Sequence, residues 1–325
     1  MIQGLFLFAD VPEEANTSYY RCIIPSKYMR SSGFDVDYRS YYDAPWTAMP
    51  ETVILERLAS REMMLKLRSA GVKRIIVTFD DLYAKLPPGS ASLPFWKKHH
   101  PNFVRSLEEA DLVIVPSQNL ADYYVKRCKE IRVVPNYHDP ELWLFTPEEK
   151  PPDTLAIGWG GSMTHAQTWQ NPGLLAALAF VLKDNAQARL HVNSHPAHEP
   201  LERAGIPHLV YPWCAFADWP KRVASFDIGI APLTGEYDKA RSNLKVVEYG
   251  LAGIPWVASA GGEYEKAKGG MLYTNFQDMR EAMQFLIDNP EVRTKLGEEG
   301  KRWAQEYLIT MNLQVYPGLF GLTKN

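Results

Sequence analysis

Short apolar runs alternate with amphipathic stretches throughout the first half of the chain. Runs of branched and aromatic residues, which have the length and composition of buried strands, lie at residues 4–9, 35–38, 53–55, 74–78, 112–115 and 131–134. Between these runs, helical spacing of apolar side chains marks residues 19–32, 60–70 and 120–128. Gly71 directly follows the second of these helices, where a left-handed cap is typical. This alternation predicts a parallel, doubly wound sheet.

The alternation stops once and then starts again. Pro147, Pro151 and Pro152 lie among charged residues, a composition that the interior of neither a helix nor a strand tolerates. Further strand-like and helix-like runs then occupy residues 154–157, 173–182, 190–193, 209–211, 227–231, 243–251 and 255–259. From residue 278 onward the pattern is helical. The sequence therefore predicts a second α/β domain.

These patterns predict the fold class α/β, with two Rossmann-like doubly wound domains that face each other across a cleft. We place the N-terminal domain at residues 1–145, a linker at residues 146–153 and the C-terminal domain at residues 154–300. Residues 301–325 carry aromatic side chains that need an apolar surface, so we expect this helical tail to pack back on the N-terminal domain. Open α/β sheets bind ligands outside the carboxyl ends of their strands, so functional residues are expected in the loops there.

Composition narrows the class of protein. The 325 residues fit two domains of ordinary size, and 46% hydrophobic with 22% charged residues is typical of a folded globular protein. With 35 basic and 38 acidic residues, the net charge of −3 argues against a strongly basic nucleic-acid-binding domain. Its three cysteines have no metal-ligand spacing, and no run reaches the ~18 apolar residues of a membrane span. We therefore expect a cytoplasmic protein without integral membrane contact.

A glycine-rich segment follows the first strand of the second half. Gly160, Gly161 and Ser162 lead to His165. Glycines let the backbone approach a ligand closely, and the N–H groups of a turn can bind phosphate. The segment matches neither the dinucleotide fingerprint nor the P-loop. From the residues alone, a phosphate-binding turn and an ordinary tight turn both stay open, and His165 is equally a capping or packing residue.

A second segment combines a helix start suited to an anion with a charged pair. Ser242 or Asn243 is placed to cap a helix whose N-terminal dipole favours an anion. Lys245 in the first turn opposes that dipole unless an anion such as a diphosphate binds beside it. Glu248 lies one turn further on the same side. The alternative is a surface pair of Lys245 and Glu248 with little energetic effect.

Taken together, these segments resemble those of a known family. GWGGSMTH, DIGIAPL and SNLKVVEYGLAGIPWVAS, and more faintly VPNYHDPELW, are similar to the nucleotide-sugar domain of GT-B fold glycosyltransferases of the retaining, family-4-like group (glycosyl transferases group 1). SYYRCIIPSKYMRSSGFDV and VTFDDLY extend the resemblance into the first half. The resemblance implies transfer of a sugar from a nucleoside diphosphate sugar with retention at the anomeric carbon, and no cofactor besides this co-substrate.

The resemblance also implies roles for single residues. It places at the donor Gly160, Gly161, Ser162, His165, Trp213, Ser242, Asn243, Lys245 and Glu248. Glu248 is similar to the glutamate that binds the ribose hydroxyls, and Lys245 completes a clamp on the leaving diphosphate. Trp213 lies where the base is held, with plain core as its alternative. Ala240 departs from the family, because many members have a glutamate there beside the sugar; Glu236 and Asp238 are acidic neighbours that could replace it.

Asp80 and Asp81 follow the strand at residues 74–78. Their candidate roles are a catalytic or acceptor-orienting carboxylate, a helix cap and a metal ligand. We place both with Lys245 among the catalytic residues and expect no metal site, because GT-B enzymes resemble one another in using backbone donors and cations instead. Arg21 is interpreted as a phosphate or acceptor contact or a surface arginine. The basic run at residues 97–100 is interpreted as a solvated loop, with an anionic acceptor or membrane surface as its alternative partner.

The sequence thus predicts a metal-independent glycosyltransferase. One alternative is a nucleotide-sugar-binding protein of the same fold that has lost transfer, which Ala240 makes conceivable. Another is an epimerase or phosphorylase of the same architecture. The partner is a nucleotide sugar donor, and the acceptor stays open among a surface glycan, a lipid-linked sugar, hydroxymethylated DNA, a protein and a small metabolite.

Overall fold

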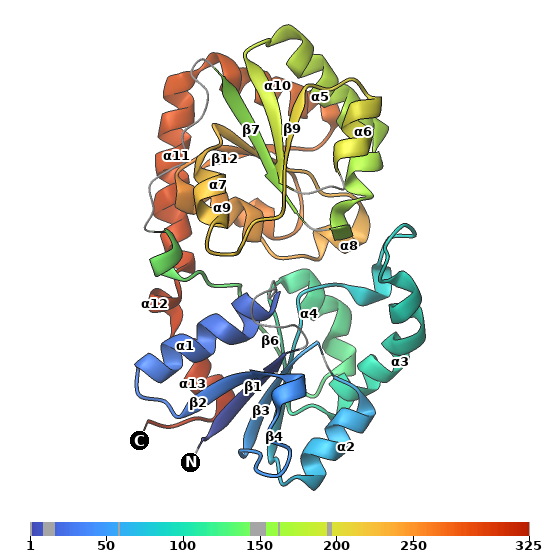
Figure 1. The fold of residues 1–325 in the computed structure, drawn as a ribbon, viewed down its shortest axis with the longest axis vertical. Helices are drawn as coiled ribbons and strands as arrows, with labels where there is room; N and C mark the ends of the chain where they lie inside the picture. Colours follow the sequence, from blue (N-terminus) through green and yellow to red (C-terminus); the bar gives the residue numbers. More distant parts are fainter. Residues whose placement is uncertain are drawn as a thin grey trace.

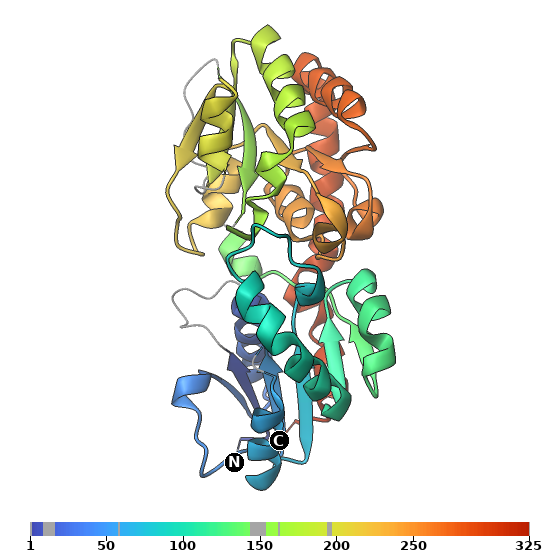
Figure 2. The same cartoon turned by 90° about the vertical axis from the view of Figure 1, so that its right-hand side faces the viewer.

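The computed structural model describes residues 2–8, 17–57, 59–143, 154–161, 163–193 and 197–324. Within these ranges, the chain forms two lobes stacked along the long axis of the molecule, each built on one parallel sheet (Figures 1 and 2). Each sheet has six strands there, with helices packed on its faces. The arrangement confirms the predicted α/β fold class with two Rossmann-like domains.

The first sheet has the strand order β2-β1-β3-β4-β5-β6. Its strands are β1 (Gly4–Phe8), β2 (Val36–Ser40), β3 (Thr52–Glu56), β4 (Arg74–Thr78), β5 (Leu112–Val115) and β6 (Ile131–Val133). Neighbours are parallel, and the register places Val53 beside both Leu5 and Ile75. All three side chains are buried in one core cluster. Each strand-like run of the first half therefore forms a strand close to its predicted bounds.

The helices of the first domain follow the predicted alternation, with one correction. They are α1 (Ile24–Ser31), which continues a π-helical turn at Tyr19–Ile23, α2 (Arg61–Ser69), α3 (Leu93–Glu109) and α4 (Gln118–Tyr124). Gly71 has φ +87°, as expected of a left-handed cap. The basic run at residues 97–100 lies inside α3, so the predicted loop is wrong. Phe103, Val104 and Leu107 bury one face of α3, and this packing keeps the polar segment helical.

The second sheet has the strand order β12-β11-β10-β7-β8-β9. Its strands are β7 (Leu155–Gly160), β8 (Ala188–Asn193), β9 (His208–Tyr211), β10 (Ile228–Ala231), β11 (Trp256–Ser259) and β12 (Gly270–Tyr273). The helices are α5 (Pro172–Asp184), α6 (His198–Arg203), α7 (Trp219–Ala224), α8 (Gly235–Lys239), α9 (Leu244–Ala252), α10 (Phe276–Asp288) and α11 (Pro290–Ala304). The sequence pattern did not predict β12, which is a short edge strand with mixed burial that begins with glycine.

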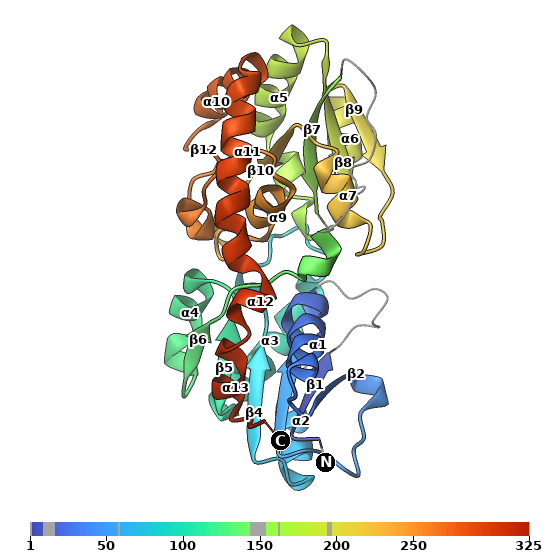
Figure 3. The ribbon, with the colours of Figure 1, turned by 90° about the vertical axis from the view of Figure 1, so that its left-hand side faces the viewer.

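The C-terminal tail returns to the first domain. From α11 the chain runs through α12 (Ile309–Asn312) and α13 (Val315–Phe320) alongside the first lobe (Figure 3). The Phe320 ring meets Phe6 of β1 edge-on, with 5.4 Å between ring centroids. His138 connects the tail to the loop after β6, because its N–H donates to Tyr307 O (2.8 Å) and its carbonyl accepts from Ile309 N (2.9 Å). The predicted linker at residues 146–153 lies outside the described residues.

Candidate functional site

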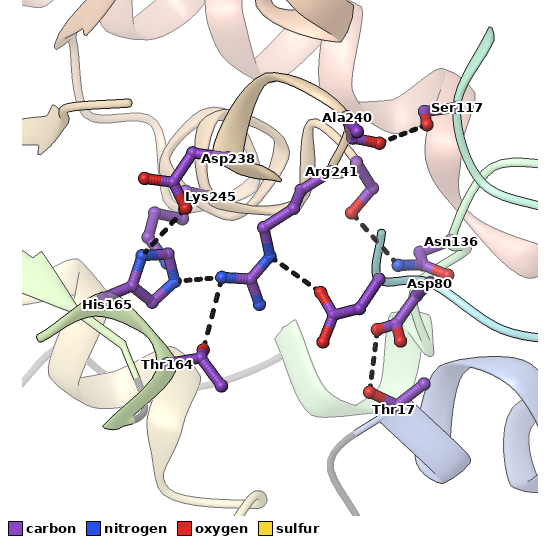
Figure 4. Close-up of polar contacts among 12 residues, drawn as sticks. Thr17, Asp80, Ser117, Asn136, Thr164, His165, Asp238, Ala240, Arg241 and Lys245 are labelled. Atoms are coloured by element: carbon purple, nitrogen blue, oxygen red, sulfur yellow. Dashed lines mark hydrogen bonds and ion pairs between the residues drawn. The ribbon is translucent and has the colours of Figure 1, made fainter. Parts of the chain in front are cut away.

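The candidate site lies where the carboxyl end of β4 meets the start of α9. Asp80 and Asp81 lie just beyond β4, separated from its end by one residue, as predicted, and belong to the first domain. Lys245 and Glu248 lie in α9 of the second domain. Arg241, between α8 and α9, reaches across to Asp81, with 3.2 Å between Arg241 Nε and Asp81 Oδ1. The structure therefore brings Asp80 and Asp81 of the first domain and Lys245 of the second to one interdomain site around Arg241; Figure 4 shows Asp80, Arg241 and Lys245 there.

Two cations share one histidine nitrogen at this site. His165 Nε2 lies 2.7 Å from Arg241 Nη1 and 3.2 Å from Lys245 Nζ. His165 is 5% exposed. Burial lowers the pKa of His165 well below its usual range, and the neighbouring Lys245 and Arg241 lower it further. The imidazole is therefore neutral and accepts hydrogen bonds from both cations.

The two cations differ in how their surroundings affect them. Burial lowers the pKa of Lys245 to about 8, and the nearby Arg241 contributes in the same direction. Burial also acts to lower the pKa of Arg241, but the carboxylate of Asp81 and further acidic groups outweigh it and the pKa is raised. Arg241 is thus a permanent cation, whereas Lys245 loses its charge more readily than an exposed lysine.

The two aspartates of the first domain have different surroundings. Asp81 pairs with Arg241. Asp80 Oδ2 accepts a hydrogen bond from Thr17 Oγ1 (2.7 Å), while its Oδ1 is shielded from solvent and has no hydrogen-bond partner among the described residues. Burial and then the adjacent Asp81 raise the pKa of Asp80 to about 6. Asp80 therefore binds a proton more tightly than an ordinary aspartate, a property found at sites where protons are exchanged.

Glu248 is buried at the domain boundary. It is 4% exposed, and its Oε1 accepts a hydrogen bond from the Tyr20 hydroxyl of the first domain (2.8 Å). Burial raises the pKa of Glu248, and hydrogen bonds from the side chains of Trp219 and Tyr20 act against this rise. The surface pair with Lys245, the alternative that the sequence left open, is excluded by this burial.

The glycines of the predicted phosphate turn have a packing role in this structure. Gly160 ends β7, and a Cβ atom there would lie 2.1 Å from Trp219 Cη2. A Cβ atom on Gly161 would lie 2.6 Å from Trp159 Cζ2. Aromatic rings therefore require glycine at both positions. Because β7 extends to Gly160, the turn begins later in the chain than the sequence predicted. Their contact with a diphosphate stays a prediction, and Ser162 lies outside the described residues.

Capping at the start of α9 also differs from the prediction. Asn243 occupies the N-cap position of α9, but its side chain makes no capping hydrogen bond. Instead, it is hydrogen-bonded to Tyr307 of the tail segment. Ser242 Oγ accepts a hydrogen bond from Asn136 Nδ2 of the first domain (3.2 Å). Tertiary contacts thus replace the local cap that the sequence predicted.

The side chain at position 240, directly after α8 of the second domain, packs against the first domain. Ala240 is 3% exposed and belongs to the core cluster of the first domain, and its carbonyl accepts a hydrogen bond from Ser117 Oγ. Asp238 accepts from Thr234 N (2.8 Å) and Thr168 Oγ1 (3.1 Å), so it belongs to an internal network. The Glu236 side chain is 74% exposed and pairs with Lys85. Of these three positions, none carries a free carboxylate at the interdomain site.

Trp213 and Arg21 lie at opposite extremes of burial. Trp213 follows β9 and is 58% exposed, so the core alternative is excluded and its ring is accessible for a base. Arg21 is 6% exposed and donates to Thr78 Oγ1 (2.8 Å) and to the carbonyl of Val134 (2.7 Å). The interpretation of Arg21 as a surface residue is therefore wrong, and its contact with a phosphate or acceptor stays a prediction. A buried arginine needs such internal acceptors.

Three residues of the site escaped the sequence analysis: Tyr20, Trp219 and Arg241. Arg241 directly follows Ala240 in the sequence. The glycine-rich segment contains no arginine or lysine, which indicated that a second cation for a diphosphate had to come from elsewhere. Tyr20 is separated from Glu248 by 228 positions, so no local pattern connects them. Among the described residues, no group of three or more histidine, cysteine, aspartate or glutamate side chains is arranged to hold a metal ion.

Comparison with known proteins supports the fold. No family model matches this chain, and no curated protein does. A sucrose-phosphate synthase from Thermosynechococcus elongatus superposes with a TM-score of 0.72 at 16% identity, over 98% of this chain and 99% of the other. The Anabaena protein HepE, in complex with UDP-glucose, has a TM-score of 0.67 at 15% identity, over 98% of this chain and 100% of the other.

A third similar structure is an α-glucosyltransferase in complex with UDP and a 13-mer DNA containing an HMU base, with a TM-score of 0.66 at 10% identity, over 99% of this chain and 100% of the other. Full coverage of both chains means that the whole two-domain architecture is shared. The chain therefore has the GT-B fold of glycosyltransferases. No helix in the described part of the chain has the length and apolar character that crossing a bilayer requires.

Proposed function

We propose that this protein is a glycosyltransferase that takes a sugar from a nucleoside diphosphate sugar. The observation that carries the proposal is the pair of cations, Arg241 and Lys245, on one neutral acceptor at the interdomain site. A single imidazole lone pair cannot fully satisfy an ammonium and a guanidinium together. The two cations therefore leave donors for an anion with several oxygens, as a diphosphate is.

Glu248 and Trp213 are proposed for the remaining contacts with the sugar donor. Glu248, one turn after Lys245, is an acceptor for the ribose hydroxyls, which would replace the Tyr20 hydroxyl. The exposed ring of Trp213 is available to the base. The UDP and UDP-glucose held by two proteins of the same fold make a uridine nucleotide the first to test. Resemblance to the retaining, family-4-like group supports retention of configuration.

The proposed roles of the site residues follow from the bonds that change in the reaction and from the charge that develops on the departing diphosphate. The bond between the anomeric carbon and the diphosphate oxygen breaks, a bond to an acceptor oxygen forms, and the acceptor proton leaves. Lys245 and Arg241 would stabilise the negative charge on the departing diphosphate without a metal ion. Asp80 and Asp81, on the opposite side of Arg241, would orient the acceptor hydroxyl or receive its proton.

The test is nucleotide binding without metal. We expect UDP to raise the melting temperature in the presence of EDTA, and UMP to raise it less. In Arg241→Ala, UDP affinity should fall about tenfold or more while the affinity for uridine stays the same. Equal shifts by UDP and UMP, or a shift that requires a divalent ion, would contradict a metal-free diphosphate clamp. Release of free sugar from a UDP-sugar without acceptor distinguishes a transferase from a protein that only binds the donor.

A further inference from the structure

His165 lies between the two cations and an internal carboxylate. Its Nε2 accepts from Arg241 Nη1 (2.7 Å) and Lys245 Nζ (3.2 Å), as Figure 4 shows for Arg241. A nitrogen that accepts carries no proton, so the proton of the neutral ring is on Nδ1. Nδ1 lies 4.0 Å from Asp238 Oδ1 and has no hydrogen-bond partner among the described residues. The ring is therefore oriented by cations on one side and faces an anion on the other.

Asp238 is itself held rigidly. Its Oδ2 accepts from Thr234 N (2.8 Å) and Thr168 Oγ1 (3.1 Å), and the residue is 5% exposed. These bonds leave Oδ1 directed toward the imidazole. A carboxylate in that place favours the Nδ1–H tautomer, because it attracts the N–H dipole. Asp238 thus orients the His165 ring, and its charge also raises the pKa of Arg241 and acts against the lowering of the pKa of Lys245.

We propose that His165 and Asp238 form a positioning pair, in which the neutral Nδ1–H tautomer of His165 keeps Arg241 and Lys245 directed at one diphosphate. The inference rests on the proposed function, because it takes the diphosphate as the ligand. His165 is then a positioning residue rather than a donor contact, which changes the role that the resemblance implied for it. Hydrogen bonds that hold cationic side chains in place are typical of binding sites whose geometry must already be correct when the ligand binds.

A neutral acceptor suits this place better than either charged alternative. An imidazolium would direct N–H donors at two cations and would repel them. A carboxylate would neutralise a cation and weaken its attraction for the ligand. Neutral His165 separates and orients the cations while both keep their charge. The charged groups that face it are Asp238, Arg241 and Lys245, from the α8 helix, the loop after it and α9.

The experiment compares His165→Leu with His165→Gln. Leucine fills space without accepting a hydrogen bond, whereas the glutamine carbonyl can accept from both cations. We expect His165→Leu to weaken UDP binding about tenfold, with uridine affinity unchanged, and His165→Gln to stay within about threefold of the wild type for UDP. His191→Leu is the matched control, because His191 is equally buried in the same domain and contacts Tyr211 instead. Its UDP-to-uridine affinity ratio should equal that of the wild type.

Nitrogen NMR of the His165 ring supplies a second readout that needs no ligand. We expect the Nδ1–H tautomer in the wild type, and an increased share of the neutral Nε2–H tautomer in Asp238→Asn, because loss of the carboxylate disfavours the imidazolium. An Nε2–H tautomer or an imidazolium in the wild type at pH 7 overturns the inference even if His165→Leu fails to fold. If the wild type binds UDP and His165→Leu binds it equally well, the inference fails and the proposed function stands. If the wild type binds no UDP, the proposed function fails and the inference fails with it.

Discussion

Tyr20 and Glu248 meet across the boundary between the two domains, where the Tyr20 hydroxyl donates to Glu248 Oε1 at 2.8 Å. Both residues are buried. The contact joins the π-helical turn before α1 to α9, so it links the first domain to the helix that carries the candidate ribose acceptor. Binding of a ribose at Glu248 would therefore compete with a contact that holds the domains together.

Removal of the Tyr20 hydroxyl should lower the stability of the fold and raise the affinity for UDP. In Tyr20→Phe the carboxylate loses one donor in a buried place, and we expect the free energy of unfolding to fall by about 1–2 kcal/mol. UDP affinity should rise several-fold, because the ribose no longer competes with a phenol. Chemical denaturation and calorimetric titration measure the two effects. Tyr42→Phe, at an exposed tyrosine, is the control. A loss of UDP affinity in Tyr20→Phe would mean that Tyr20 assists the ligand.

Replacement of Glu248 tests the placement of the donor. In Glu248→Ala the two ribose hydroxyls lose a charged acceptor in a buried site, a loss of roughly 1.5–3 kcal/mol, or about a 10- to 150-fold weaker UDP affinity. The control ligand is the 2′,3′-dideoxy nucleotide, which should bind the wild type and the variant almost equally. If the variant still prefers ribose to dideoxyribose as the wild type does, Glu248 has a structural role only.

The pH dependence of binding should report on Lys245. Its pKa is lowered to about 8 by burial and by Arg241, and a bound diphosphate favours the charged form. UDP affinity should therefore be constant below about pH 8 and fall above it, by up to about tenfold per pH unit. Lys245→Arg keeps its charge and should remove this decline. Titration calorimetry from pH 6.5 to 9.5 checks it, and a decline that persists in Lys245→Arg would assign it to another group.

Asp80 should make stability depend on pH in the acid range. Its folded-state pKa is raised to about 6 from the usual 3.8, so the folded protein holds the proton more tightly than the unfolded chain. The free energy of unfolding should therefore decrease as pH rises from about 4 to about 6. Asp80→Asn should remove this slope and stabilise the protein at pH 7 by on the order of 2 kcal/mol.

Urea denaturation at pH 5 and pH 7 measures this effect, with the exposed Asp184→Asn as the control. Destabilisation of Asp80→Asn at pH 7 would show that the hydrogen bond from Thr17 to a charged Asp80 dominates instead.

The sequence by itself determined the two-domain α/β architecture and identified the site residues Asp80, Asp81, Lys245 and Glu248. Apolar runs of strand length, separated by helical spacing, specify alternating β and α elements, because side-chain periodicity decides which face of each element is buried. Lys245 and Glu248 are one helical turn apart, so a local pattern was sufficient to place both on one side of α9. Asp80 and Asp81 were found for a similar reason, since they lie just beyond the end of the β4 strand.

Only the tertiary structure decided which side chains meet. The basic run at residues 97–100 became helical through packing of α3, and Gly160 is required by the ring of Trp219 rather than by a turn. Arg241, Tyr20 and the tautomer of His165 depend on contacts between residues far apart in the chain. Such contacts arise when two separate sheets bring their loops together, and local periodicity contains no information about that docking.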